Sequence, residues 1–346
     1  MGRIISREFI NDLQSGVLSP LMKIIKGDNE LIICFRDGYA SVYYKSHSIL
    51  NIKEQTNNYK FTFDLGHARY FDTFVNVKKE LEALNIEATK TKKEDKFTAV
   101  FYVKKNRDIE FDFQTIINTY KKYEESFYIS GQTNDLFTLR KTKKTSPLRE
   151  KRHQQVLFKM HQNLSICNGL LFYDMELSLP KPKRNSIEEK DVIKECGKHI
   201  TGAPDCLAVK LENGMVKKIV LVEVKSTRKA CNGNNGILKH DKDFNDIIKC
   251  SYYRNFIVES MRETLKLYER LGICSKVIVP EQLGEHVKDF EVLYFFTHEE
   301  VIDWTVNSRN DSKNNLKKYK ELYNSNPDMF RFVNDDMKHL MGKEYN

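Results

Sequence analysis

The chain has 346 residues, 40% of them hydrophobic, so it is long enough to form two domains with ordinary buried cores. With 57 basic and 48 acidic residues, its formal net charge of +9 permits a polyanionic partner without demanding one. The 7 cysteines include no Cys-x-x-Cys pair, which argues against a disulfide framework and against a zinc site. No signal segment opens the chain and no apolar stretch approaches the length of a membrane span, so we expect a cytoplasmic protein without a membrane partner.

Residues 1–138 are predicted to form an α+β domain. Apolar positions at helical spacing over residues 5–25, interrupted by Gly16 and Pro20, predict one or two short helices. An antiparallel meander follows, with Asp37-Gly38 as its first hairpin turn. Its strands are expected at 31–36, 40–45, 48–53 and 60–65. The remaining elements of this domain are expected to be a helix at 71–84, a strand at 97–103 and a helix at 113–123.

The meander carries Tyr39, Tyr43 and Tyr44 together with basic residues. Cross-strand packing accounts for such tyrosines, and a nucleic-acid surface is the alternative. No catalytic constellation occurs in this domain. We expect it to recognise a target, or to bind a protein partner that could be a second copy of the chain.

Residues 139–147 are polar and basic, lack periodicity and end in proline, which predicts a solvated linker; a contact to backbone phosphates is the alternative. Ser146 and Pro147 then signal the start of a helix over 148–164. A strand at 169–179 and a short helix at 187–196 are expected next. Cys34, Cys206 and Cys250 lie within apolar runs and are predicted to be buried.

The later part of the chain predicts one long helix that begins at Asp241 or Asp243 and ends at Leu271. Strands are expected at 275–279 and 290–296. The end of the chain, 301–346, is polar and is predicted to form a helical extension. Helices in this region are expected at 299–303, 314–323 and 329–341, with Trp304 packing the tail.

The stretch from Gly202 to Thr227 contains the most informative pattern. A Glu-Asn-Gly turn at 212–214 separates two apolar runs, which predicts a hairpin. Glu223 and Lys225 end the second run and share a face, because side chains alternate along a strand. Asp205 opens the partner strand, so pairing brings its carboxylate to the same end. Two carboxylates and an ammonium group at a sheet edge suit a divalent metal and an attacking water.

From residue 148 the predicted order is one helix, three strands, a long helix and further strands. With Pro204-Asp205 on the second strand and Glu223-Val224-Lys225 on the third, this pattern resembles the PD-(D/E)XK nuclease superfamily over residues 148–296. The resemblance implies an α/β fold: a restriction-endonuclease-like αβββαβ core in residues 148–300, with a mixed central sheet flanked by helices. It also implies metal-dependent hydrolysis of nucleic acid, with DNA favoured over RNA, in an endonuclease serving restriction, antiviral defence, repair or a mobile element.

The same resemblance implies roles for individual residues. Asp205 and Glu223 would be ligands of Mg²⁺ or Mn²⁺, with the Val224 carbonyl as a third ligand. Lys225 would position or activate the attacking water and stabilise developing negative charge. The preceding helix often contributes an acid in this superfamily, and Glu150 is the matching residue.

Several alternatives remain open. Glu223 and Lys225 could form an ordinary exposed ion pair at a strand end. Glu176 rivals Glu150 as the fourth acid. His240, Asp241 and Asp243 lie near the start of the long helix, where the aspartates would serve as caps or the group would contribute to the site. The whole domain could also be a catalytically silent nuclease fold that binds nucleic acid or a partner.

Overall fold

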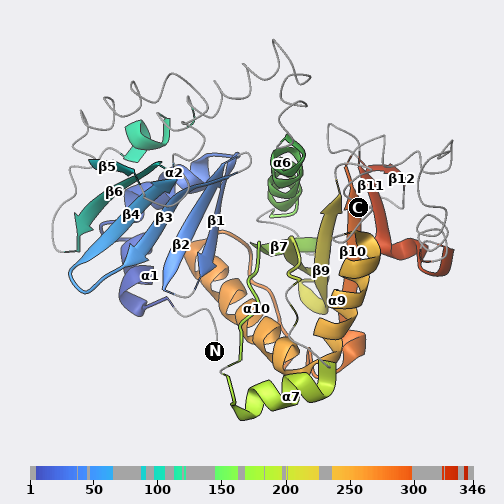
Figure 1. The fold of residues 1–346 in the computed structure, drawn as a ribbon. Coiled ribbons are helices and arrows are strands. Elements are labelled where there is room, and N and C mark those ends of the chain that lie inside the picture. The colour runs from blue at the N-terminus through green and yellow to red at the C-terminus, as the bar shows by residue number, and fades with distance from the viewer. Residues whose placement is uncertain are drawn as a thin grey trace. The chain divides into compact units, whose positions relative to one another are not determined.

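The computed structural model divides the chain into two compact units: an N-terminal unit, Arg3–Thr145, and a C-terminal unit that begins at Ser146 (Figure 1). The structure describes residues 5–36, 38–44, 47–64, 87–90, 97–105, 113–118, 121, 145–162, 168–182, 184–196, 200, 202–225, 236–297, 322, 324–333 and 339–341. The predicted elements at 71–84, 299–303 and 314–321, together with Trp304, lie outside these residues, as do residues 139–144 of the predicted linker.

The N-terminal unit is a six-stranded antiparallel sheet with helices. Its strands follow the spatial order β1-β2-β3-β4-β6-β5. The bounds are β1 Leu31–Arg36, β2 Tyr39–Tyr44, β3 His47–Glu54, β4 Asn58–Asp64, β5 Glu87–Lys90 and β6 Phe97–Lys104. The helices are α1 Arg7–Gln14 and α2 Ser19–Gly27, and residues 113–118 are also helical.

Local chemistry explains these elements. The Ser6 hydroxyl caps α1 by accepting a hydrogen bond from the backbone N–H of Phe9 at 2.9 Å. Pro20 lies in the first turn of α2, where a proline suits the helix start, so it opens a helix instead of breaking one. The four strands of the predicted meander and the strand at Phe97 are confirmed. β5 was not predicted, because its Glu-Ala-Thr-Lys sequence has no apolar alternation.

The C-terminal unit is built on a second six-stranded sheet with the order β12-β11-β10-β9-β8-β7. Its strands are β7 Gly169–Met175, β8 Cys206–Glu212, β9 Met215–Lys225, β10 Phe290–Phe296, β11 Phe330–Val333 and β12 His339–Met341. Its helices are α6 Thr145–Met160, α7 Ile187–Cys196, α9 Ile237–Lys249 and α10 Ser251–Leu271, with short 3-10 turns at Val287–Asp289 and Pro327–Met329. β7 to β9 are antiparallel, β9 to β11 are parallel and β12 is antiparallel, so the predicted α/β fold with a mixed sheet is confirmed.

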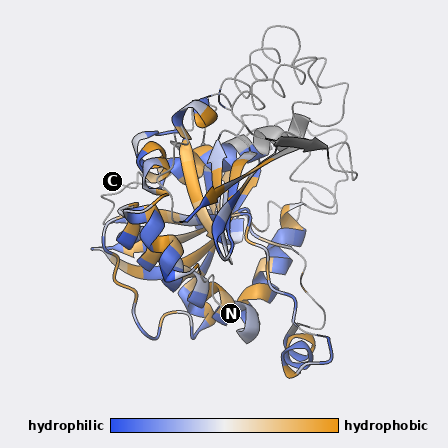
Figure 2. Ribbon diagram, turned by 90° about the vertical axis from the view of Figure 1, so that its left-hand side faces the viewer, coloured by the Kyte–Doolittle hydropathy of each residue, from blue (hydrophilic) through white to orange (hydrophobic). Residues whose placement is uncertain are grey.

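The burial of β9 agrees with its central position in the sheet. β9 is buried from Ile219 to Lys225, as expected of a central strand that is covered on both faces. The helices carry hydrophilic and hydrophobic residues along their length, as helices packed on one side do (Figure 2). Cys34, Cys206 and Cys250 are all buried, which confirms the prediction made for them.

The two faces of the β9–β10 pair are covered by different helices. Phe295 is paired with Val224, and its ring packs at 6.3 Å against the ring of His161, which directly follows α6. Tyr294, on the opposite face, is paired with Glu223, and its hydroxyl contacts Asp241 of α9. The carboxylate of the predicted motif therefore lies on the face that α9 covers, and α6 packs against the other face.

Two helix predictions needed correction. α6 begins at Thr145, so the last residues of the expected linker are helical. The expected long helix is two helices, and the first starts at Ile237. They separate at Cys250, where Arg254 donates hydrogen bonds to the last carbonyls of α9, those of Ile248 and Lys249, at 2.8 and 2.7 Å.

Two further predictions were wrong. Residues 275–279 form only an isolated bridge between Ile278 and Met215. The helix expected at 329–341 is instead a pair of short strands, because Phe330 pairs with Tyr294 and its ring stacks on Phe296 at 5.7 Å. The C-terminal segment thus extends the central sheet and is not a purely helical extension.

Candidate active site

The hairpin β8–β9 brings Asp205 and Glu223 to one end of the sheet. Its turn residues Asn213 and Gly214 both have positive φ, 50° and 72°, as a tight two-residue hairpin requires. The ladder pairs Cys206 with Val222, so Asp205 and Glu223 face each other one step further along it. The Val224 N–H donates a hydrogen bond of 2.8 Å to Asp205 Oδ2, which holds that carboxylate against β9 beside Glu223.

Glu223 and Lys225 are not an exposed ion pair. Glu223 is 1% exposed and Lys225 is 4% exposed, and the Lys225 ammonium hydrogen-bonds to Glu223 Oε1. His240 Nε2 lies 3.3 Å from the same oxygen. Burying such charges costs free energy that their mutual attraction does not reliably return, so stability alone gives little reason to retain them. Buried charged groups of this kind mark candidate functional sites.

A hydrogen bond to Asp241 holds α9 against the face of the sheet that carries Glu223. The Tyr294 hydroxyl donates a hydrogen bond of 3.3 Å to Asp241 Oδ1, and Asn245 donates to the other carboxylate oxygen at 3.2 Å. Burial raises the pKa of Asp241, against the lowering effect of these two hydrogen bonds. Burial, and then the neighbouring Asp241 and Glu223, raise the pKa of the Tyr294 phenol, which therefore stays protonated and can donate.

α9 also packs against the segment that leads into β8. A Cβ atom at Gly202 would lie 2.6 Å from Asp243 Oδ2, so only glycine fits this approach without a shift. Asp243 is 3% exposed. Because α9 is capped at Gly236, Asp241 and Asp243 lie inside the helix, and their interpretation as caps is wrong. The first half of α9 therefore contacts Glu223, through His240, and the segment that leads to Asp205.

The remaining predicted acids lie at different places around this end of the sheet. Glu150 belongs to α6, one turn before His153, whose Nδ1 hydrogen-bonds to the Thr297 hydroxyl just beyond β10. The Thr297 N–H in turn donates to the Lys225 carbonyl at 3.1 Å. This chain of contacts brings α6 to the carboxyl end of β9 from the face opposite Glu223, and the role of Glu150 stays a prediction.

Glu176 and Asp174 lie on or beside β7. Glu176 has a positive φ of 52° and forms an ion pair of 2.7 Å with Lys151, and its N–H donates to the Asp205 carbonyl at 2.8 Å. Asp174 is fully buried and is paired with Leu207, on the same face of the sheet as Glu223. Sequence reasoning missed Asp174, although an aspartate inside the apolar run of β7 was the available signal. Tyr294 was also missed, but here the sequence offers no signal, because a tyrosine within the apolar run Phe290–Phe296 is typical of a buried core.

The donor set fits a hard divalent cation. In the described residues no group of three or more His, Cys, Asp or Glu side chains is arranged to hold a metal ion. Mg²⁺, however, is usually bound by one or two carboxylates and keeps several waters. Asp205 and Glu223 supply two such carboxylates, and the Val224 carbonyl, implied by the family resemblance, would add a third oxygen.

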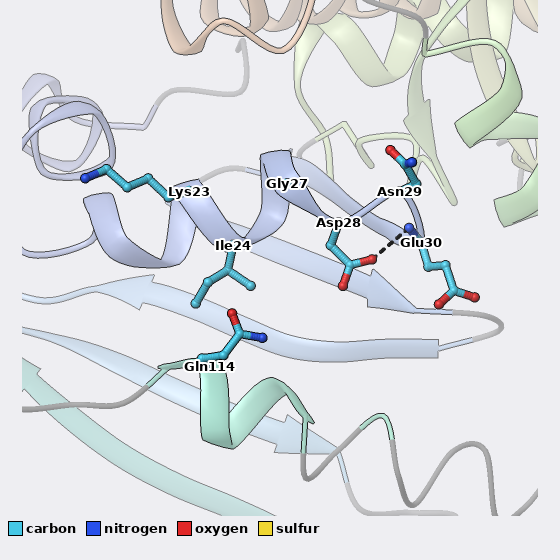
Figure 3. Close-up of a pocket in the computed structure, with 7 residues that line it drawn as sticks. All are labelled: Lys23, Ile24, Gly27, Asp28, Asn29, Glu30 and Gln114. Carbon is cyan, nitrogen blue, oxygen red and sulfur yellow. Dashed lines mark hydrogen bonds between the residues drawn. The ribbon is translucent and has the colours of Figure 1, made fainter.

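The structure also contains a hollow in the N-terminal unit, of about 630 Å³ (Figure 3). It is lined by Lys23, Ile24, Gly27, Asp28, Asn29, Glu30 and Gln114. Asp28 accepts a hydrogen bond of 2.9 Å from the Glu30 N–H and pairs with Lys121, whose Nζ is also 3.7 Å from Glu30 Oε2. These contacts account for its carboxylates as parts of the turn between α2 and β1.

No family model, curated protein or solved structure gives a significant match to this chain. The resemblance to PD-(D/E)XK nucleases therefore stays a prediction from the motif residues and the order of the elements. Among the helices that the structure describes, none is long and apolar enough to cross a membrane.

Proposed function

We propose that this chain is a cytoplasmic, metal-dependent nuclease that hydrolyses phosphodiester bonds, with DNA as its substrate and endonucleolytic cleavage as its mode. One observation carries the proposal: the buried Glu223–Lys225 pair lies opposite Asp205 at the end of a hairpin. The element order around it is α6, β7, β8, β9, the α9–α10 pair and β10, with α7 inserted before β8, and it agrees with the superfamily's αβββαβ core.

Each residue has a distinct task in this proposal. Asp205 and Glu223 would hold Mg²⁺ or Mn²⁺ together with the Val224 carbonyl. The bound cation would polarise the phosphate and lower the pKa of a coordinated water. Lys225 donates to the attacking water or to a non-bridging phosphate oxygen, where its charge offsets the negative charge that develops in the transition state.

Two features of the chain support these tasks. The Asp205 carboxylate is already oriented by the Val224 N–H, so it needs little reorganisation to serve as a ligand. The Lys225 ammonium lies at the carboxylate that would bind the metal, which is where a phosphate oxygen would approach. Glu150 or Glu176 would complete the site as the fourth acid.

The biological setting follows from the resemblance alone. The C-terminal unit would cut nucleic acid in restriction, antiviral defence, repair or the movement of a mobile element. The N-terminal unit would recognise the target, a partner protein or a second copy of the chain. Double-strand cleavage requires two sites, which a homodimer would supply.

The test is a cleavage assay on plasmid, linear duplex, single-stranded DNA and RNA, each with Mg²⁺, Mn²⁺ or EDTA. We expect metal-dependent products from DNA, and none from the Asp205→Ala protein. Asp205→Asn is the matched control for folding, because the amide oxygen can still accept the Val224 hydrogen bond while the charge is lost. If no substrate gives a metal-dependent product, the domain is a catalytically silent binding module.

A further inference from the structure

Five residues form a row across five adjacent strands of the N-terminal sheet. The ladders pair Arg36 with Tyr39, Tyr39 with Lys53, Lys53 with Lys60, and Lys60 with Tyr102. Because directly paired residues of antiparallel strands share a face, all five side chains leave the sheet on the same side. We call this set the basic row. At about 4.8 Å per strand it spans roughly 19 Å.

The opposite face of this sheet forms the core of the unit. Tyr59 and Phe61 alternate with Lys60 along β4, so they point away from the basic row. Tyr59 packs against Phe9 of α1 at 5.1 Å between ring centroids, and Phe61 packs against Phe113 at 5.5 Å. The sheet therefore has one face that α1 and the 113–118 helix cover, and the basic row lies on the other.

The basic row is accessible where it crosses β3, β4 and β6. Tyr102 is 53% exposed, Lys53 is exposed, and Lys60 is half-buried. Lys104 lies two residues beyond Tyr102 on the same face of β6 and is also exposed. An exposed aromatic ring beside two lysines is an unusual use of a strand position, since large aromatic side chains are ordinarily buried in contact with neighbours.

The charged side chains in and next to the basic row are all positive. The acidic residues that the ladders place on this face lie away from the row: Asp64 is four positions along β4 from Lys60, and Glu87 on β5 is paired with Val100. The neighbouring acid, Glu54, points to the other face, where it accepts from Ser6 at 2.7 Å and from Lys105 at 2.9 Å. Glu54 thus stabilises the covered face, and in the described part of the chain no carboxylate forms an ion pair with Lys53, Lys60 or Lys104.

The register places two residues of like charge directly opposite each other on β3 and β4. Lys53 and Lys60 are cross-strand partners, and like charges directly opposite each other destabilise a sheet. A polyanion bound across the strands would offset this repulsion, because its negative charge attracts both ammonium groups. The pairing of Lys53 with Lys60 is therefore evidence for an anionic partner that is independent of the exposed tyrosine.

We propose that the basic row and Lys104 bind single-stranded nucleic acid. The lysines contact backbone phosphates, and the ring of Tyr102 stacks on a base. Stacking platforms of this kind need an unpaired base, because a paired base in a duplex offers no free face. An acidic peptide would satisfy the lysines alone and would make no use of the exposed ring, so the tyrosine decides the class of partner.

The test is fluorescence anisotropy of labelled oligothymidine and of a duplex of equal length, with the full chain in EDTA. EDTA prevents metal-dependent cleavage, so the result is independent of the proposed nuclease activity, and Asp205→Ala should bind like the wild type. We expect tighter binding of the single strand. Tyr102→Ala should weaken it by roughly 5- to 150-fold, the range of one base stack, and Tyr102→Phe should restore it.

The role of the lysines is tested with the double variant Lys53→Ala/Lys60→Ala. The control is Lys23→Ala/Lys26→Ala, which removes the same charge from the exposed side of α2. If each lysine contacts one phosphate, the first pair should reduce the salt dependence of log K by about 1.4, and the control pair should leave it unchanged. Thermal melting of every variant excludes unfolding as the cause.

Four results would overturn the proposal. Two concern the variants: equal losses from both lysine pairs, or unchanged binding in Tyr102→Ala. The third is displacement of the oligonucleotide by polyglutamate as readily as by unlabelled single strand, which would identify a general polyanion surface. The fourth is absence of any oligonucleotide binding in EDTA, a result that would leave the proposed nuclease activity to be tested separately by the cleavage assay.

Discussion

The two sheets of this protein use charge in opposite ways. On the N-terminal sheet, Lys53 and Lys60 repel each other on an accessible face. On the C-terminal sheet, Glu223 and Lys225 are buried and bonded to each other, with His240 beside them. Exposed charge without compensation favours the capture of a polyanion, and buried, compensated charge is the arrangement in which electrostatic effects on a reaction are strong. The first sheet is thus suited to binding and the second to chemistry.

The largest effect should come from the carboxylates opposite each other on β8 and β9. Glu223→Gln and Asp205→Ala should each reduce cleavage to the level seen with EDTA, because the metal loses one of its two charged ligands. The measurement is the initial rate of DNA cleavage at saturating Mg²⁺. Oligonucleotide binding in EDTA should stay at the wild-type level. If these variants also lost oligonucleotide binding, the assignment of binding to the N-terminal sheet and of cleavage to the C-terminal sheet would be wrong.

Removing the buried ammonium should affect both rate and stability. Lys225→Met should slow cleavage by about 10²–10³-fold, because a charge at the developing negative oxygen is lost. It should also lower the free energy of unfolding by about 3–5 kcal/mol, since Glu223 is left buried without its main partner. Denaturant unfolding of Lys225→Met and of Glu223→Gln/Lys225→Met measures this cost, and the double variant should recover much of it. A double variant no more stable than the single one would contradict the pairing.

His240 should act as a positioning residue for Glu223. His240→Ala should weaken Mn²⁺ binding, measured by calorimetry, by about 10- to 100-fold, which is the usual cost of losing a group that orients a ligand. His240→Gln places an amide N–H at similar reach and should restore most of the affinity. A purely structural role would instead lower the melting temperature of both variants equally and leave Mn²⁺ affinity unchanged.

The smallest effect is expected on the N-terminal sheet. Lys60→Glu replaces a like-charge pair with an opposite-charge pair and should stabilise the protein by about 0.2–1 kcal/mol, measured by denaturant unfolding at low salt. The same substitution should weaken single-strand binding. A variant that gained stability and kept full binding would show that the charge serves no partner.

Much of the fold was predictable because local signals agreed with long-range packing. The hairpin around Asn213-Gly214 combines turn residues suited to positive φ with a strongly apolar strand, and the structure contains it as expected. The break between α9 and α10 was not predictable. Apolar spacing continues through Cys250, and the break is stabilised by Arg254 and by Glu195 of α7, which accepts a 2.6 Å hydrogen bond from the Ser251 N–H.

The candidate site was predictable only in part. Strand alternation is enough to place Glu223 and Lys225 on one face, but it says nothing about their burial, which depends on α9 covering that face. The contact between His240 and Glu223 joins residues 17 positions apart and requires the chain to return after β9. The strand β11 was missed because Phe330–Val333 becomes a strand only against the edge of β10.

A single-turnover cleavage assay tests the central claim most directly. With the full chain in excess over a labelled DNA duplex, the measurement compares wild type, Asp205→Asn and the lysine pair Lys53→Ala/Lys60→Ala. We expect Mg²⁺-dependent cleavage by the wild type, none by Asp205→Asn, and cleavage at the wild-type rate by the lysine variant once binding is saturated. Cleavage by Asp205→Asn equal to the wild type, or cleavage that persists in EDTA, would contradict the assignment of the active site.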